Sequence, residues 1–224
     1  MQVDLVSISQ PRVAGLSSAE ELIAYCARVS NPGNQSNFQT APALLAYLVR
    51  NQHWSPFEMV SLTVKVSTTR DIARQMLRHR SFSFQEFSQR YAQPDAFNPV
   101  LREARLQDPR NRQASIDASQ DHGLQTWWAR EQAAVASHAA TVYSAAVGRG
   151  VAKEVARAVL PEGNTESSLY MAGTLRSWLH YVQLRTDVAT QLEHRQVALA
   201  IQALLLVEFP SLSEVLAQEG ACGQ

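Results

Sequence analysis

The sequence contains few cysteines, and their spacing suggests neither a metal site nor a disulfide framework. Only two are present among 224 residues: Cys26 lies within a helical pattern, and Cys222 lies near the end. Zinc sites and small disulfide scaffolds need several such residues at short, regular intervals. We therefore expect no metal site, and a reducing, cytoplasmic setting fits this composition.

Long apolar runs and an excess of either charge are also missing. No stretch approaches the roughly 20 consecutive apolar residues of a membrane helix, and residues 1–10 lack the features of a secretion signal. The 20 Lys and Arg residues balance the 20 Asp and Glu residues. Proteins that bind nucleic acid through its phosphates usually carry a basic face. We expect neither membrane nor nucleic acid as a partner.

Length and hydrophobic pattern predict one α/β (α+β) domain over residues 1–224, with several helices around a small sheet. Hydrophobic residues make up 46% of the chain, which suits one sizeable core. Val60, Leu62, Val64 and Val66 alternate with polar residues and predict a half-buried strand. Shorter strands are expected at residues 1–10 and 169–173. Helices are expected at residues 17–29, 42–50, 127–147, 153–160, 175–185 and 190–209, and after Thr69.

Residues 95–120 are polar and contain prolines. We expect a long loop there, because the segment has neither helical nor strand periodicity.

The run from Arg78 to Tyr91 is unusually dense in polar and charged side chains. It reads Arg-His-Arg-Ser-Phe-Ser-Phe-Gln-Glu-Phe-Ser-Gln-Arg-Tyr. Arginine forks next to hydroxyl and amide groups suit a phosphorylated ring compound. A solvated helix end that enters a loop is also consistent with this run.

The helix before this run is predicted to have an apolar face and a cationic face. The apolar stripe consists of Ile72, Ala73, Met76 and Leu77. The cationic face consists of Arg70, Arg74 and Arg78, flanked by Gln75 and His79. The phenylalanines that follow, Phe82, Phe84 and Phe87, could be a stacking surface or part of the core.

Three separated blocks of residues resemble the flavin-dependent thymidylate synthases, in the order found in that family. The first is Arg78-His79-Arg80 with Ser83, Glu86, Ser88, Arg90 and Tyr91, preceded by His53-x-x-Pro56-Phe57-Glu58. The second is Glu154-Val155-Ala156-Arg157 with Leu160-Pro161. The third is Leu184-Arg185-x-Asp187 with Gln191 and Glu193. The resemblance covers roughly residues 27–201.

This resemblance implies a homotetramer with sites shared between subunits, and it implies a reaction. The reaction is the reductive methylation of deoxyuridine monophosphate (dUMP) to thymidylate (dTMP). The carbon donor is 5,10-methylenetetrahydrofolate, and FAD with NADPH supplies the reducing equivalents. Two alternatives remain open at this point: a flavin-dependent uridylate hydroxymethylase, and a catalytically silent nucleotide-binding module.

The resemblance also assigns site residues. Those expected to bind dUMP are Gln75, Met76, Leu77, Arg78, Glu86, Phe87, Ser88, Gln89, Arg90, Arg157 and Arg185. Those expected to bind FAD are Ser55, Arg78, His79, Arg80, Glu86, Thr174, Arg176 and His180. His53 is expected at the folate and flavin end of the site.

Arg185 is the expected catalytic residue. Methylation at carbon 5 of uracil needs electron density there, and a guanidinium can stabilise the negative charge that develops on the N3 and O2 side. An ion pair with Asp187 near the helix end is the structural alternative. Ser88 is expected to contact phosphate and not to act as a nucleophile, because no third group is evident that would orient His79 as its base.

Overall fold

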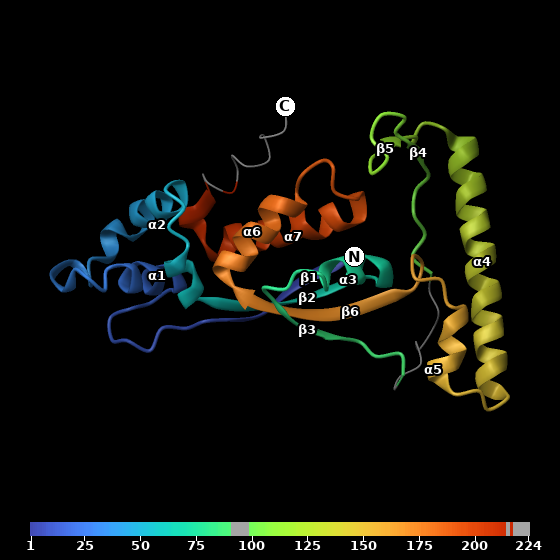
Figure 1. Cartoon of the computed structure of the whole chain (residues 1–224), viewed down its shortest axis with the longest axis horizontal. Coiled ribbons are helices and arrows are strands. Elements are labelled where there is room, and N and C mark those ends of the chain that lie inside the picture. The colour runs from blue at the N-terminus through green and yellow to red at the C-terminus, as the bar shows by residue number, and fades with distance from the viewer. Residues whose placement is uncertain (91–98, 214–215, 217–224) are drawn as a thin grey trace. The chain divides into compact units, whose positions relative to one another are not determined.

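The computed structural model describes residues 1–90, 99–213 and 216, which form helices and a small sheet (Figure 1). Tyr91 of the polar run and Cys222 lie outside these residues. In chain order the helices and strands are β1 (Gln2–Ile8), α1 (Ala19–Ala27), α2 (Ala41–Arg50), β2 (Ser61–Thr69), α3 (Arg70–Met76), β3 (Ser83–Glu86), β4 (Arg105–Gln107), β5 (Ser115–Asp117), α4 (His122–Gly148), α5 (Lys153–Ala156), β6 (Glu166–Thr174), α6 (Leu175–Arg185) and α7 (Leu192–Glu208).

The strands form one four-stranded sheet and one hairpin. The sheet has the order β1-β2-β6-β3, and β4 pairs with β5 in a separate two-stranded sheet. The mixed α/β fold class is therefore confirmed. Val60, Leu62, Val64 and Val66 are at most 2% exposed, so the predicted buried face is confirmed, although β2 continues three residues further, to Thr69.

Contacts between residues divide the chain into two compact units. The first comprises the described residues of 1–66, 79–84 and 170–224, and the second comprises those of 67–78 and 85–169. Strands β2, β3 and β6 each begin in one unit and end in the other.

The first unit holds most of the large buried side chains. Trp178 on α6 is fully buried, and its Nε1 donates a hydrogen bond to the carbonyl oxygen of Leu62, 3.3 Å away. The backbone N–H of Leu175 donates to the carbonyl of Val60 at 2.8 Å, where α6 follows β6. Full burial of a large apolar side chain contributes roughly 1.5–3 kcal/mol to the stability of the folded chain. These contacts fix the start of α6, and with it the direction of the side chains along that helix.

Helix α1 begins as the sequence predicts but ends earlier. The hydroxyl of Ser18 accepts from the N–H of Glu21, and the Glu21 carboxylate accepts from the Ser18 N–H, so a capping box is present. The helix ends at Ala27, two residues before the expected Val29.

In the second unit, α4 and α5 pack against each other (Figure 1). Tyr143, Ala156 and Leu160 form a small buried cluster between them, with Ala146 and Val147 at its border. Helix α4 is longer than predicted and begins at His122, because the side chain of Asp121 accepts from the N–H of Leu124 at 2.9 Å.

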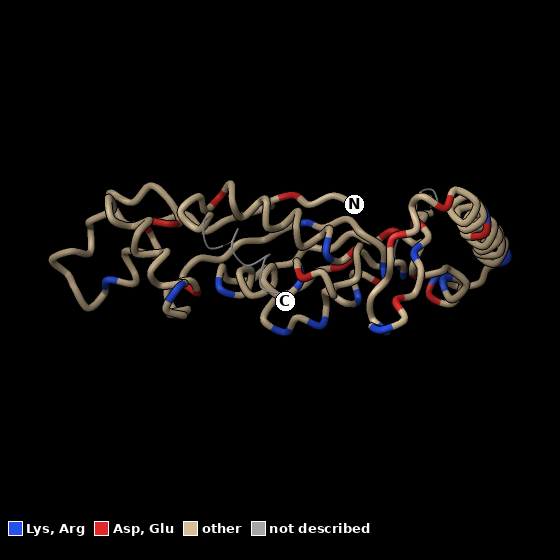
Figure 2. Tube along the Cα trace, turned by 90° about the horizontal axis from the view of Figure 1, so that it is seen from above, with Lys and Arg blue, Asp and Glu red and all other residues tan. Residues whose placement is uncertain are grey.

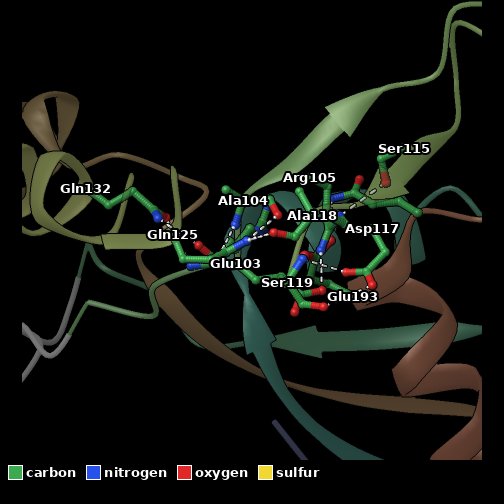
Figure 3. Close-up of polar contacts among 12 residues, drawn as sticks. Glu103, Ala104, Arg105, Ser115, Asp117, Ala118, Ser119, Gln125, Gln132 and Glu193 are labelled. Carbon is green, nitrogen blue, oxygen red and sulfur yellow. Dashed lines mark hydrogen bonds and ion pairs between the residues drawn. The ribbon is translucent and has the colours of Figure 1, made fainter. Parts of the chain in front are cut away.

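The expected long loop at residues 95–120 is corrected by the structure: its described part, from residue 99, includes the β4–β5 hairpin. Arg105 is opposite Asp117, and Gln107 is opposite Ser115. Figure 3 shows how Gln125 of α4 holds this segment: its Oε1 accepts from the N–H of Ala104 and its Nε2 donates to the Ala104 carbonyl, both at 2.9 Å. A helix side chain thus supplies the bonds that a neighbouring strand would otherwise make.

A second glutamine repeats this arrangement two turns further along α4. Gln132 accepts from the N–H of Arg102 at 3.0 Å and donates to its carbonyl at 2.8 Å. Residues seven apart lie on one face of a helix, so Gln125 and Gln132 bind the same extended segment. This amide pair is why residues without strand periodicity form an ordered structure.

Charges are interspersed along the trace, and neither sign is concentrated in one long segment (Figure 2). Among the described residues, no helix is long and apolar enough to cross a membrane. Within the same residues, no group of three His, Cys, Asp or Glu side chains could hold a metal ion.

Candidate functional site

The centre of the candidate site in the first unit is a hydrogen bond between Arg185 and His79. Arg185 is the last residue of α6, and its Nε donates to Nε2 of His79 at 3.0 Å. This bond requires that His79 Nε2 carry no proton. Asp187, the alternative partner for Arg185, instead accepts from the N–H of Ala189 at 2.7 Å. No ion pair joins Arg185 to Asp187 within the described part of the chain.

Aromatic rings surround His79. Its ring meets the ring of Tyr181 edge-on, with centroids 4.9 Å apart, and lies 6.5 Å from Phe82. Phe82 packs against Trp178 at 4.7 Å and is 9% exposed. Phe82 is thus a core residue, whereas Phe87 is exposed. The core reading therefore holds for Phe82, and a stacking role for the exposed Phe87 stays a prediction.

The titratable ring side chains around Arg185 are uncharged at neutral pH. Burial, and then the nearby Arg185, lower the pKa of His79 to about 4. Burial, Arg185 and His79 lower the pKa of His194 to about 4. Burial raises the pKa of Tyr181. At neutral pH His79 is therefore uncharged and able to accept the bond from Arg185.

A second group of predicted residues in the first unit surrounds Arg176. Its Nη1 donates to the carboxylate of Glu58. His180, one helical turn along α6, meets the ring of Trp54 edge-on at 4.6 Å. Burial and then Arg176 lower the pKa of His180. The Arg176 cation and the neutral imidazole of His180 thus lie one turn apart on α6, and the indole of Trp54 packs against the imidazole.

The other residues predicted to bind flavin in this unit occupy more peripheral positions. Thr174 caps α6, because its hydroxyl accepts from the N–H of Ser177 at 3.4 Å. Ser55, Arg80 and His53 are exposed, and the ring of His53 lies 6.0 Å from that of Tyr47. Exposed hydroxyl, guanidinium and imidazole groups leave polar atoms for a ligand.

In the second unit, Glu86 is the centre of a polar cluster. The hydroxyl of Ser167 donates to its carboxylate at 2.7 Å, and Arg70 lies 3.7 Å from it. Arg74 forms an ion pair with Glu162. The predicted cationic face is thus divided, since Arg70 and Arg74 are paired with carboxylates while Arg78 is exposed.

The loop after Glu86 carries the predicted phosphate ligands. The Ser88 hydroxyl accepts from the N–H of Arg90 at 3.4 Å, and Nε of Arg90 lies 3.6 Å from Glu154. Gln89 is 3% exposed, and its Nε2 has no hydrogen-bond partner among the described residues. Arg157, half-buried, begins the 3₁₀ turn that follows α5. An unsatisfied buried donor is costly and often marks a ligand site.

Of the remaining predicted nucleotide residues, three lie at the end of α3, and Phe87 follows β3. Met76 is fully buried and Gln75 is partly buried, whereas Leu77 is exposed. Leu77 does not belong to the apolar stripe, because α3 ends at Met76. Phe87 is held by its backbone, whose N–H donates to the carbonyl of Ser168 at 2.8 Å.

Several side chains that take part in these clusters were not predicted from the sequence. They are Trp54, Tyr181, His194, Ser167 and Ser168. The spacing of four residues between Tyr181 and Arg185 could have indicated that both lie on one helix face. No local pattern indicates that His194 contacts Tyr181.

Comparison with known proteins identifies the class to which this fold and these residues belong. A family model described as thymidylate synthase complementing protein (Thy1) matches residues 13–211. The chain belongs to this family.

Two relatives are similar to this chain over almost their entire length. A probable flavin-dependent thymidylate synthase of Paramecium bursaria Chlorella virus 1 is 48% identical over 216 residues, covering 96% of this chain and 99% of the relative. A flavin-dependent thymidylate synthase of Synechocystis sp. is 45% identical over 219 residues, with the same coverage. The resemblance to flavin-dependent thymidylate synthases is thus confirmed.

Solved structures support the same class. A UMP/dUMP methylase, PolB from Streptomyces cacaoi, bound with 5-Br dUMP, matches with a TM-score of 0.79 at 29% identity, over 98% of this chain and 95% of that chain. The structure of that protein bound with 5-Br UMP matches with a TM-score of 0.75 at 28% identity, over 98% and 94% of the two chains.

Proposed function

We propose that this chain is a flavin-dependent thymidylate synthase, which methylates dUMP to dTMP with 5,10-methylenetetrahydrofolate, FAD and NADPH. The observation that carries this conclusion is the 48% identity to a probable flavin-dependent thymidylate synthase over 99% of that protein's length. Because the similarity extends over the whole length of that relative, this chain can contain every residue that the reaction needs.

The second unit supplies groups that suit a nucleotide phosphate. Ser88, Arg90 and Arg157 offer a hydroxyl and two guanidinium forks, which are strong phosphate ligands. The unpartnered Nε2 of Gln89 supports a ligand at this loop, because a bound acceptor would satisfy a donor that otherwise stays unbonded. Gln75, Met76, Leu77, Arg78, Glu86 and Phe87 complete the proposed dUMP-binding set.

Arg185 is proposed to stabilise the charge that develops on the pyrimidine. Its Nε is bonded to His79, so one edge of the guanidinium is held, and its terminal N–H groups are proposed to donate to the ligand. A fixed cation next to the N3 and O2 edge favours electron density at carbon 5, where the new bond forms. Arginine stays protonated throughout the working pH range, so this role needs no proton transfer by Arg185.

The residues proposed to hold FAD fit its chemistry. A flavin dinucleotide presents an anionic diphosphate and a planar ring, and when bound it supplies the reducing equivalents for methylation. The exposed side chains of Arg80 and Ser55 can donate to phosphate oxygens. The half-buried Arg176, the capping Thr174 and His180, which lies against the ring of Trp54, add further donors. His53 is proposed for the folate and flavin end.

The assembly is proposed to be a homotetramer with shared sites, in the cytoplasm. An exposed apolar row on α4 supports self-association: Trp128, Val135 and Val142 are 36%, 58% and 37% exposed. They are seven residues apart, which is the spacing of a helix seam packed against another helix. Light scattering should give four times the chain mass of 24.8 kDa, and Val135→Glu should reduce the measured mass.

UMP is a second candidate substrate, because the matching solved structure is a UMP/dUMP methylase and was determined with 5-Br UMP as well as 5-Br dUMP. Parallel assays with the two nucleotides separate these candidates. Turnover of dUMP alone supports the first, and turnover of UMP supports the second.

The flavin requirement is tested by the absorbance spectrum of the purified protein before and after anaerobic addition of NADPH, with and without dUMP. A flavin spectrum that bleaches with NADPH is expected. A colourless protein that binds dUMP but leaves it unchanged would mean that the fold serves only as a nucleotide-binding module.

A further inference from the structure

Two buried side chains to which the proposed function assigns no role lie next to the Arg185–His79 bond. Tyr181 on α6 and His194 on α7 are 1% and 0% exposed. The Tyr181 hydroxyl and Nε2 of His194 are 3.0 Å apart and share a hydrogen bond. Burying two polar groups costs free energy that apolar side chains of similar size avoid. Filling the core therefore does not account for the pair.

The rings of Tyr181 and His194 both pack against the ring of His79. The His79 centroid lies 4.9 Å from that of Tyr181 and 6.3 Å from that of His194, and both rings meet His79 nearly edge-on, at 71° and 86°. The Tyr181–His194 bond ties α6 to α7 at this point. Rotation of either ring would open space next to His79 and admit water.

The same helix face carries Arg185. It follows Tyr181 by four residues, so the two side chains leave α6 on one side. His79 accepts from the guanidinium of Arg185 through Nε2 and packs against the ring of Tyr181. It therefore contacts both side chains on this face of α6. If the His79 ring turned or took a second proton, it could no longer accept from Arg185.

We propose that Tyr181 and His194 are positioning residues, whose hydrogen bond holds His79 as a neutral acceptor and thereby sets the orientation of Arg185. This inference rests on the proposed role of Arg185 in the reaction. The charged or titratable groups in contact with His79 are Arg185 and Tyr181 from α6 and His194 from α7. Arg185 is the cation among them, and both it and burial keep His79 unprotonated.

The substitution Tyr181→Phe keeps the ring and removes only the hydroxyl. His194 then loses this bond, the rings at positions 181 and 194 are held less firmly, and water reaches His79. We expect kcat at pH 6 to fall at least about fivefold, because Arg185 is no longer held in one orientation, while KM for dUMP changes by less than about twofold. The loss should grow as the pH is lowered, because a protonated His79 cannot accept from Arg185. Flavin content should stay that of the unaltered enzyme.

The direct test is NMR of the flavin-loaded enzyme labelled with ¹³C in its histidine rings. There are six histidines, and a spectrum of His79→Gln assigns the signal of His79. In the unaltered enzyme this ring should be the neutral form with its proton on Nδ1, down to about pH 5. In Tyr181→Phe its titration midpoint should rise by about one pH unit or more.

A matched control is Tyr143→Phe. Tyr143 is also buried, but it lies on α4 in the other unit, and its hydroxyl has no hydrogen-bond partner among the described residues. This variant should change neither the His79 titration nor kcat.

An unchanged His79 titration in Tyr181→Phe, or a proton on Nε2 in the unaltered enzyme, overturns the proposal. The second result does not require Tyr181→Phe, so the test remains decisive if that variant fails to fold. The NMR result does not depend on turnover. An enzyme with the expected His79 behaviour but no product would contradict the proposed function and leave the positioning role supported.

Discussion

Arg185 donates the N–H of its Nε to Nε2 of His79 across 3.0 Å, which joins the end of α6 to the polar run that follows α3. The bond fixes one edge of a guanidinium whose other edge can meet a ligand. A cation held in this way needs little reorganisation when charge develops on a bound pyrimidine, and this property makes electrostatic catalysis effective.

Arg185→Ala removes that cation and should lower kcat by about 10²–10³-fold. The flavin should remain bound, because the proposed FAD ligands do not include Arg185. Flavin absorbance per chain and single-turnover product formation measure the two properties separately. Arg50→Ala, a change at an exposed arginine on α2 in the same unit, should leave both unchanged. A variant with normal turnover would exclude Arg185 from the chemistry.

Ser88→Ala should weaken dUMP binding and leave measurable turnover. The hydroxyl is proposed as a phosphate ligand, and one lost hydrogen bond to a charged group corresponds to roughly 1.5–3 kcal/mol. Calorimetric titration with dUMP gives the affinity, and product formation at saturating dUMP gives kcat. Ser213→Ala, at an exposed serine, is the control. Complete loss of kcat with intact dUMP binding would point to a nucleophilic serine.

Stability should fall as the pH is lowered from 6.5 to about 4. Both His79 and His194 have a pKa near 4 in the folded chain against 6.5 for the free side chain. Within this window the unfolded chain binds more protons than the folded one, so acid favours unfolding. Each such proton makes the free energy of unfolding fall by about 1.4 kcal/mol per pH unit.

Urea denaturation at pH 7 and pH 5 measures this effect. His194→Leu should flatten the pH dependence, whereas His138→Gln, at an exposed histidine on α4, should not. Equal stability at the two pH values would show that the buried histidines do not titrate as described.

Gly173→Ala should destabilise the first unit by about 1–3 kcal/mol. A Cβ at residue 173 would lie 2.5 Å from Cδ1 and 2.8 Å from Cε1 of Phe82. Phe82 cannot easily move away, because its ring packs against Trp178 at 4.7 Å. Urea denaturation measures the change, with Gly148→Ala as the control, since nothing lies within 4 Å of a Cβ there. A loss no larger than that of the control would show that Phe82 adjusts freely.

Periodicity alone predicted the parts of the fold in which one face is buried. The alternation from Val60 to Val66 and the helical pattern of α6 reflect burial on one side, and α6 has the predicted bounds, 175–185. The β4–β5 hairpin could not be predicted in this way, because the residues that flank its strands, Arg102, Ala104 and Ala118, are held by the side chains of Gln125 and Gln132 on a helix. Such amide bonds leave no periodic signal in the strands themselves.

The candidate site was predictable where a family motif marks its residues, as at His79 and Arg185. Their neighbours were not predictable. His194 has a buried position that depends on how α7 packs against α6, and its contact with Tyr181 joins residues on different helices. Contacts of this kind follow from tertiary packing, and no local spacing encodes them.

The most direct test of the account is the mass of the nucleotide formed when the flavin-loaded enzyme receives dUMP, 5,10-methylenetetrahydrofolate and NADPH. We predict a product heavier than dUMP by one CH₂ group, formed only when all three are present. A product that carries one further oxygen would identify a hydroxymethylase, and recovery of unchanged dUMP from a flavin-loaded enzyme would contradict the assignment.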